Sequence, residues 1–205
     1  MDKSVWKRIE ESRERWNVLR HPFYQRWEAG ELTAAELASY SGQYRHAVGA
    51  IATLSEAAAV DAPAHPELRD HAAEERDHVR LWDGFVEAVG GNAGAEASPE
   101  TSHCVSAWTA HGDAVEHLAR LYAIESGQPE ISKTKLSGLA EHYGVTKTAG
   151  TAYFTIHSTR DLDHAAEARE LLEELAEPGD EDRIVAAAES AFRANWRLLD
   201  GVPAP

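Results

Sequence analysis

Three polar residues in the C-terminal half of the chain have types and spacing suited to binding a metal ion. His157, Asp161 and His164 are separated by four and then three residues. Residues at i, i+4 and i+7 share one face of an α-helix, so two imidazoles and a carboxylate would converge there. These groups bind a redox-capable first-row metal such as iron, whereas a thiolate site is excluded because the chain has a single cysteine. The pattern therefore predicts part of an iron site.

Two further segments supply groups of the same kind. Glu75 and His78 lie three residues apart, and Glu74 and His71 flank them as possible replacements for Glu75. Glu125 follows an apolar segment, in which a buried carboxylate without a partner is costly, so a metal ion would satisfy it. We therefore predict a metal site built by three helices, with these ligands: Glu75, His78, Glu125, His157, Asp161 and His164.

Length and charge indicate a single domain that handles small molecules. A chain of 205 residues with 43% hydrophobic content suffices for one sizeable core, so we expect one domain over residues 1–205. The net charge is -15, from 20 Lys and Arg against 35 Asp and Glu, which argues against nucleic acid or an anionic membrane surface as a partner. No apolar run approaches the ~18 residues that span a bilayer.

The cysteine content and the start of the sequence bear on location. Cys104 is the single cysteine and cannot form an intrachain disulfide. The first residues are charged, whereas a secretory signal would contain an apolar core. We therefore expect a reducing, cytoplasmic environment.

Helical periodicity dominates the chain, and no alternating Val/Ile/Thr-rich segment indicates a strand, so we predict an all-α fold. The helix after Thr33 should begin with a capping box, because Glu36 follows three residues later. The expected helices cover residues 3–19, 22–30, 33–60, a segment carrying Glu75 and His78 that ends near 90, 106–127, a shorter segment from 129, 151–176 and 182–199.

The longest predicted loop runs from Gly90 to Ser102. A second Glu-x-x-His match, Glu100 with His103, falls in this Ser-, Pro- and Gly-bearing stretch. A rigid helical face is not expected there, so we leave this pair out of the metal site.

The complete ligand set resembles that of a known family. A ferritin-like di-iron bundle uses two Glu-x-x-His motifs, whereas this chain offers one such motif and a His-x3-Asp-x2-His pattern. The set is similar to that of the haem-oxygenase-like di-iron oxidases, whose superfamily includes the TenA thiaminases and the oxidase that closes the pyrroloquinoline quinone ring. The resemblance implies a single-domain, seven-helix haem-oxygenase-like bundle that binds two iron ions, or manganese and iron, uses dioxygen as co-substrate and forms a homodimer.

Several motifs, in one order, resemble in particular the para-aminobenzoate-forming group that includes the chlamydial death-domain-associating protein. They are His-Pro-Phe-Tyr-Gln-Arg-Trp (21–27), Gly-Glu-Leu-Thr (30–33), Gln-Tyr-Arg-His (43–46), Leu-Trp (81–82), Glu-Ser (125–126), Lys-Leu-Ser-Gly-Leu (135–139) and Tyr-Phe-Thr (153–155). In that group, the tyrosine matching Tyr24 is regarded as the source of the aromatic ring and the lysine matching Lys135 as the source of the amine, with the tyrosine matching Tyr40 nearby. The resemblance implies that these three residues are catalytic in a self-sacrificing reaction.

Two departures from that group leave other functions open. The group separates its first carboxylate and histidine ligands by seven residues, whereas Glu75 and His78 are three apart, as in the di-iron fatty-acid decarboxylase branch. Small residues at 49–52 also replace a bulkier segment, which would change the pocket volume. The alternatives are a multiple-turnover oxygenase acting on an amino acid or fatty acid, and a non-catalytic helical binding protein. In these readings Tyr24 and Tyr40 are packing residues and Lys135 is a solvated surface amine.

Overall fold

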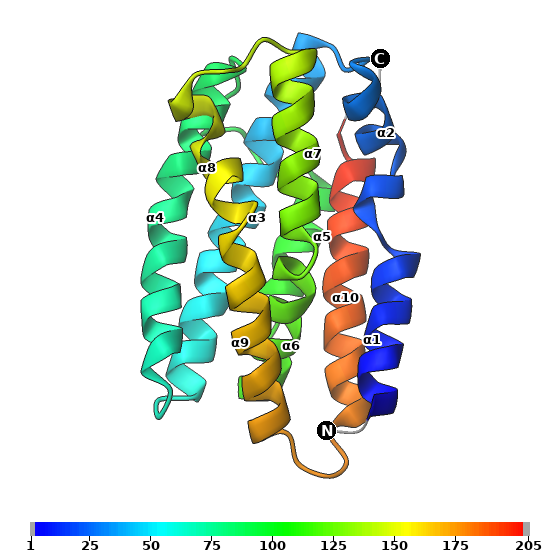
Figure 1. Cartoon of the computed structure of the whole chain (residues 1–205), viewed down its shortest axis with the longest axis vertical. Helices are drawn as coiled ribbons and strands as arrows, with labels where there is room; N and C mark the ends of the chain where they lie inside the picture. The colour runs from blue at the N-terminus through cyan, green and yellow to red at the C-terminus, as the bar shows by residue number, and fades with distance from the viewer. Residues whose placement is uncertain (1–2, 203–205) are drawn as a thin grey trace.

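The computed structural model describes residues 3–202 as a bundle of helices, most of which run along the long axis of the molecule (Figure 1). These residues form ten α-helices and one short 3-10 helix and contain no strand, so the all-α prediction is confirmed and the expected count of seven helices is too low. The helices are α1 Lys3–Arg15, η1 Val18–Arg20, α2 Pro22–Ala29, α3 Ala34–Asp61, α4 Pro66–Ala88, α5 Pro99–Trp108, α6 Ala114–Glu125, α7 Gln128–Glu141, α8 Thr148–His157, α9 Arg160–Leu175 and α10 Glu181–Asp200.

Local hydrogen bonds set the ends of the N-terminal helices. The predicted capping box is confirmed, because the Glu36 amide donates to Thr33 Oγ1 at 3.2 Å and the Thr33 amide donates to Glu36 Oε2 at 2.8 Å. Helix α2 ends at Gly30, whose φ of 71° is a left-handed conformation that glycine adopts without a Cβ penalty. Helix α1 ends before residue 19, because the side chain of Asn17 accepts a hydrogen bond from the Leu19 amide at 3.0 Å and begins η1.

The predicted helix over residues 106–127 is wrong, because two helices cover this part of the chain. Helix α5 begins at Pro99, where Ser98 Oγ accepts a hydrogen bond from the Thr101 amide at 3.1 Å, so the preceding loop ends earlier than predicted. Helix α6 begins after Asp113, whose side chain accepts a hydrogen bond from the Glu116 amide at 3.3 Å. These two caps start separate helices within a stretch of continuous helical periodicity.

The predicted helix over residues 151–176 is also divided. Helix α8 ends at His157 and α9 begins at Arg160. Tighter i to i+3 hydrogen bonds close the junction, since the Thr159 amide donates to the Ile156 carbonyl at 3.1 Å and the Leu162 amide donates to the Thr159 carbonyl at 3.2 Å. The junction falls inside the His-x3-Asp-x2-His pattern, so its three side chains do not lie on one continuous helix.

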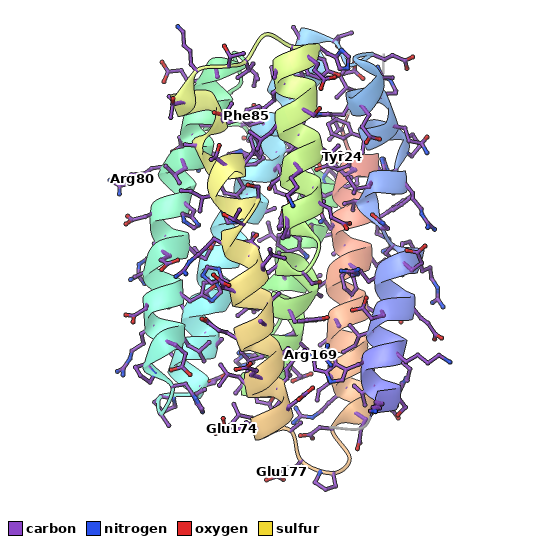
Figure 2. All side chains as sticks on the ribbon, in the orientation of Figure 1. Tyr24, Arg80, Phe85, Arg169, Glu174 and Glu177 are labelled. Carbon is purple, nitrogen blue, oxygen red and sulfur yellow. The ribbon has the colours of Figure 1, made fainter. Side chains whose placement is uncertain are left out.

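The packing around α4 brings distant segments together. Helix α4 packs against α3 and α8, and α6 packs against α9 and α10. Figure 2 shows Arg80 of α4 pointing away from the bundle, whereas Phe85 is fully buried on the same helix. Gly84 allows the close approach of α8, because a Cβ at this position would lie 2.4 Å from the Ala149 carbonyl oxygen. Within residues 3–202, no helix combines the length and the apolar character needed to cross a membrane.

Candidate metal centre

Three candidate ligands lie on one buried face of α4. His71, Glu75 and His78 are 6%, 1% and 6% exposed. His78 Nδ1 lies 2.9 Å from Glu75 Oε1, and His71 Nε2 lies 3.9 Å from the same oxygen. The carboxylate of Glu75 is therefore placed between two imidazoles.

A second set spans the junction between α8 and α9. His157 Nδ1 lies 2.8 Å from Asp161 Oδ1, and this oxygen lies 3.9 Å from His164 Nδ1. All three side chains are almost completely buried. The turn at residues 158–159 thus preserves the convergence that a single helix was expected to give.

Glu125, the last residue of α6, joins the cluster from another helix. Its Oε1 lies 2.9 Å from His71 Nε2. Two overlapping groups of possible ligand atoms result, each with all its atoms within 4.8 Å of one another: His71, Glu75 and His164, and Glu75, His78 and His157. Glu75 belongs to both groups, so its carboxylate lies where the two groups meet. The structure brings together all six predicted ligands and places His71 among them.

The polar atoms of this ligand cluster fit metal ions. Among the residues described, Glu75 Oε2, Glu125 Oε2 and His157 Nε2 are buried without a hydrogen-bond partner. Leaving such atoms unsatisfied is costly, and coordination to a cation would satisfy them. Carboxylate and imidazole together are suitable donors for iron and manganese.

The charges of the ligand cluster influence one another. Burial raises the pKa of Glu125 to about 7, although the neighbouring His71 opposes this rise. Burial lowers the pKa of His71, but the carboxylates of Glu125 and Glu75 outweigh burial and raise it to about 9. Burial and the nearby His71 lower the pKa of His164 to about 4, so this imidazole is neutral at pH 7 and keeps a lone pair for a metal bond.

The sequence predicts His71 only as a replacement for Glu75, whereas the structure places both in the cluster. The available signal was a repeated pattern, because residues 71–78 and residues 157–164 both have a histidine, an acid four residues on and a second histidine three residues later. The two segments run in opposite directions (Figure 1), so the first histidine of one meets the last of the other. The ring centroids of His71 and His164 are 4.0 Å apart, and those of His78 and His157 are 4.7 Å apart.

Two other candidates lie outside the ligand groups. The carboxylate of Glu74 is partly exposed and forms an ion pair with Arg160 at 2.7 Å. Glu100 and His103 lie on α5, so the stretch expected to be a loop is helical there. His103 is nevertheless exposed, and its Nε2 lies 3.4 Å from a guanidinium nitrogen of Arg197.

The residues expected to take part in chemistry gather in a second buried cluster. The hydroxyls of Tyr24 and Tyr40 are 3.3 Å apart. Lys135 is 0% exposed, and its Nζ has no hydrogen-bond partner in the described part of the chain. This nitrogen lies 4.8 to 5.8 Å from the centroids of five aromatic rings: Tyr24, Tyr40, Tyr44, Trp82 and Phe154. The reading of Lys135 as a solvated surface amine is therefore wrong.

Burial controls the protonation of this lysine–aromatic cluster. It lowers the pKa of Lys135 to about 7, so this amine loses its proton far more readily than an ordinary lysine does. The surrounding aromatic rings stabilise the protonated form of the amine by cation–π attraction. Burial also raises the pKa of Tyr24 and of Tyr40 well above the ordinary value, so both phenols keep their protons at neutral pH.

Aromatic side chains connect the two clusters. Tyr153 lies one helical turn before His157, with ring centroids 4.1 Å apart, and its ring is 4.9 Å from that of Trp82. The ring of Trp82 is in turn 6.0 Å from that of Tyr40. The Tyr153 hydroxyl is buried without a partner among residues 3–202. Sequence reasoning gave Tyr153 no role, although its spacing of four residues from His157 was a usable signal.

The fold and the two clusters define an all-α protein with a buried set of histidine and carboxylate side chains suited to iron. The family model of the iron-containing redox enzymes matches residues 71–196, and the chain belongs to this family. The match begins at His71 and includes every residue of the ligand cluster.

Individual relatives agree with this assignment. The chain is 30% identical over 210 residues to the 4-aminobenzoate synthase of Nitrosomonas europaea, covering 91% of this chain and 85% of that protein. It is also 30% identical over 203 residues to the 4-aminobenzoate synthase of Chlamydia muridarum, covering 92% of this chain and 86% of that protein. A domain with a haem-oxygenase-like fold from Shewanella denitrificans superposes with a TM-score of 0.79 at 21% identity, covering 98% of this chain and 92% of that one. This chain thus has the haem-oxygenase-like fold that was expected from the sequence.

Proposed function

We propose that this chain is a non-haem dinuclear metal oxidase that activates dioxygen and forms para-aminobenzoate from its own Tyr24 and Lys135. The observation that carries the proposal is the amine of Lys135, which is fully buried and unpartnered among the described residues beside the phenols of Tyr24 and Tyr40. Membership of the iron-containing redox enzymes and the similarity to 4-aminobenzoate synthases support it.

The ligand cluster would hold two iron ions, or one manganese and one iron. The proposed ligands are Glu75 for both ions, His71, Glu125 and His164 for one, and His78, His157 and Asp161 for the other. Three carboxylates against two divalent ions leave a net positive charge, which favours an anionic group entering the site. When bound, the metals supply the binding and reduction of dioxygen.

The protein's own contribution at Lys135 is to keep an amine available without its proton. An ordinary lysine has a pKa near ~10.4 and is almost fully protonated at pH 7. Burial brings the pKa of Lys135 to about 7, so a large fraction carries a free lone pair. The same burial excludes water, which protects oxidised groups from side reactions.

The aromatic residues between the clusters offer a path for electrons. Phenol and indole are among the most readily oxidised side chains, and Tyr153 and Trp82 stand between His157 and Tyr40 with successive ring separations of 4.1, 4.9 and 6.0 Å. The hydroxyls of Tyr40 and Tyr24 lie 3.3 Å apart, so a phenolic proton can move along this contact when a ring is oxidised. Readily oxidised side chains thus connect His157, a proposed ligand, to Tyr24.

Isotopic labelling of the protein itself tests this proposal. Protein containing labelled tyrosine and lysine is loaded anaerobically with Fe(II), alone or with Mn(II), and then mixed with dioxygen and a reductant. We expect no more than one labelled para-aminobenzoate per chain, with mass changes in the peptides that contain Tyr24 and Lys135. Tyr24→Phe and Lys135→Met should abolish the product.

Matched controls are available outside the lysine–aromatic cluster. Tyr122→Phe removes a hydroxyl that donates to Glu10, and Lys133→Met changes an exposed lysine on the same helix as Lys135. Both variants should form product at the wild-type level. Unmodified Tyr24 and Lys135 peptides after product has formed would contradict the self-sacrificing reaction.

A surface groove beside the metal centre supports one alternative, a multiple-turnover oxygenase for an amino acid or fatty acid. The groove has a volume of about 410 Å³ and is lined by Glu74, Asp77, His78, Arg80, Leu81 and Ile156. It would let a small molecule approach a candidate ligand. Many turnovers of an added substrate would favour this alternative, whereas an iron-loaded protein that consumes no dioxygen would favour a non-catalytic binding protein.

A further inference from the structure

We propose that Glu74, held by Arg160, is a positioning residue that orients His164 for metal binding from outside the ligand cluster. The inference rests on the proposed metal site. It gives a role to a carboxylate that the sequence left as a possible ligand.

The carboxylate of Glu74 connects a surface arginine to a buried imidazole. Arg160 Nε lies 3.0 Å from Glu74 Oε2, and Arg160 Nη2 lies 2.7 Å from Glu74 Oε1. The same Oε2 lies 3.3 Å from His164 Nε2. The Glu74 side chain is 37% exposed and that of His164 is 1% exposed, so the contact crosses the boundary of the core. Glu74 belongs to neither group of ligand atoms.

This position allows Glu74 to select the tautomer of His164. A metal-binding imidazole uses one nitrogen as ligand, and a partner on its other nitrogen fixes both the tautomer and the ring orientation. His164 Nδ1 faces Asp161, with 3.9 Å between Nδ1 and Oδ1, whereas Nε2 faces Glu74. Neither nitrogen has a well-aligned hydrogen bond among the described residues. The Glu74 carboxylate therefore favours a proton on Nε2, which leaves the lone pair of Nδ1 for the metal.

Arg160 adds a second constraint through its place in the chain. It is the first residue of α9, directly after the junction that divides the 157–164 pattern. Its ion pair with Glu74 ties this start of α9 to α4. The tie opposes a rotation of α9 that would carry Asp161 and His164 away from His157.

Cobalt titration separates a positioning role from a structural one. The full-length protein is freed of metal with a chelator and titrated anaerobically with Co(II), whose visible absorption reports the number and geometry of its ligands. Glu74→Ala should weaken one of the two Co(II) sites by about 10- to 100-fold and shift its absorption bands. Glu74→Gln should regain most of the affinity, because its amide oxygen can take the place of Glu74 Oε2, 3.3 Å from Nε2, and favours the same tautomer. Arg160→Ala should give an intermediate loss.

The control is a similar ion pair away from the ligands. Glu56 and Arg76 are exposed and pair at 3.4 Å between α3 and α4, and neither belongs to a ligand group. A surface ion pair contributes little to stability, so Glu56→Ala and Glu74→Ala should have similar melting temperatures without metal. Only Glu74→Ala should alter Co(II) binding.

Three results would overturn the inference, and they are distinguishable. Wild-type affinity and spectrum in Glu74→Ala would show that Glu74 does not position His164. Complete loss of one ion in both Glu74→Ala and Glu74→Gln would show that Glu74 is itself a ligand. Failure of the wild-type protein to bind two Co(II) ions would reject the proposed metal site on which the inference rests.

Discussion

The ligand cluster and the lysine–aromatic cluster are buried in the same bundle, but their polar groups are compensated in different ways. In the ligand cluster, groups of opposite charge lie close together, with Glu75 and Glu125 each 2.9 Å from an imidazole nitrogen. In the lysine–aromatic cluster, Lys135 Nζ has no hydrogen-bond acceptor within residues 3–202 and faces aromatic rings. A bound cation satisfies the first arrangement, whereas the cost of burying the second falls when the amine loses its proton.

This difference indicates that the ligand cluster is suited to binding a metal ion, whereas the lysine–aromatic cluster is suited to a reaction of the amine. The carboxylates and imidazoles of the ligand cluster are useful once a metal ion is bound, and binding then stabilises the fold. The buried amine of Lys135 costs stability whenever it is protonated, and such a cost is typical of residues kept for chemistry. Variants in either cluster should therefore affect different measurements.

The largest effect is expected from Glu75→Gln, which tests whether the ligand cluster is a single centre. Glu75 belongs to both groups of ligand atoms, and glutamine keeps its size but lacks the charge. The variant should bind neither ion, and product formation should fall by more than ~100-fold, beyond the range of changes outside the coordination shell. Glu125→Gln should lose one ion. Elemental analysis after anaerobic iron loading measures both.

The control for this prediction is Glu100→Gln on α5. Glu100 has the same three-residue spacing to a histidine, but His103 is exposed and belongs to neither ligand group. Its iron content should match the wild type. Two irons retained in Glu75→Gln would contradict the shared role of this carboxylate.

The next largest effect is expected from Lys135→Met. This variant removes the reactive amine and also the loss of stability that comes from burying a charged group. The pKa of Lys135 is about 7 in the fold and ~10.4 in the unfolded chain, so the unfolded chain binds more protons between these values. Wild-type stability should therefore rise as pH increases from about 7 to about 10. The variant should lack this rise, melt several degrees higher below pH 7 and form no aromatic product.

Thermal unfolding across this pH range and product analysis check the prediction. Lys133→Met is the matched control, because Lys133 is exposed two residues earlier on α7. It should keep the wild-type pH dependence and activity. A lower melting temperature of Lys135→Met at pH 6 would show that cation–π attraction outweighs the cost of burial.

The two clusters also differ in how far the sequence predicts them. Ligand spacing follows the helical period, which predicted five of the six ligands, whereas Glu125 was predicted from its apolar surroundings. The six side chains converge even though the helix is broken at residues 158–159. His71 was predicted only as a possible replacement for Glu75, because a Glu-x-x-His match already supplied one carboxylate and one imidazole on this helix. The structure places His71 and Glu75 together on the buried face of α4.

The lysine–aromatic cluster has no comparable signal in the sequence. Lys133 and Lys135 are the same residue type two positions apart, yet one is exposed and the other is completely buried. That difference depends on how α7 is rotated against its neighbours, which is a property of the tertiary packing. The resemblance to a family identified Lys135, and spacing alone did not.

A smaller effect is expected from Gly84→Ala, which tests whether the approach of α4 to α8 positions the ligands. A Cβ at Gly84 would lie 2.4 Å from the Ala149 carbonyl, so the helices must move apart. We expect a loss of about 1–3 kcal/mol in unfolding free energy and weaker metal binding, because His78 and His157 lie on these helices. Denaturant unfolding and metal titration measure the two effects.

Gly49→Ala is the matched control on α3. A Cβ at Gly49 meets no atom within 4 Å, so this variant should gain about 0.5–1 kcal/mol from helix propensity. Its metal affinity should equal that of the wild type. Full metal affinity in Gly84→Ala would show that the ligand cluster tolerates a change in helix spacing.

The smallest effect is expected at Tyr153, the residue that joins the two clusters. Its hydroxyl is buried without a partner in the described residues, so Tyr153→Phe removes an unsatisfied polar group and should not lower stability. The phenyl ring still packs between His157 and Trp82, so iron content should be unchanged. If the phenol carries oxidising equivalents, product formation should slow about 10-fold, equivalent to ~1.4 kcal/mol in activation free energy.

Rapid mixing of the iron-loaded variant with dioxygen, followed by product analysis, measures this rate. Tyr143→Phe is the control, because its hydroxyl donates to the Trp27 carbonyl at 3.1 Å and takes no part in the path from His157 to Tyr40. It should react at the wild-type rate. An unchanged rate in Tyr153→Phe would show that the ligand cluster and the lysine–aromatic cluster communicate without this phenol. A loss of iron from this variant would instead show that Tyr153 supports the metal centre. The slower reaction would then result from the missing iron and would not report on oxidation through the phenol.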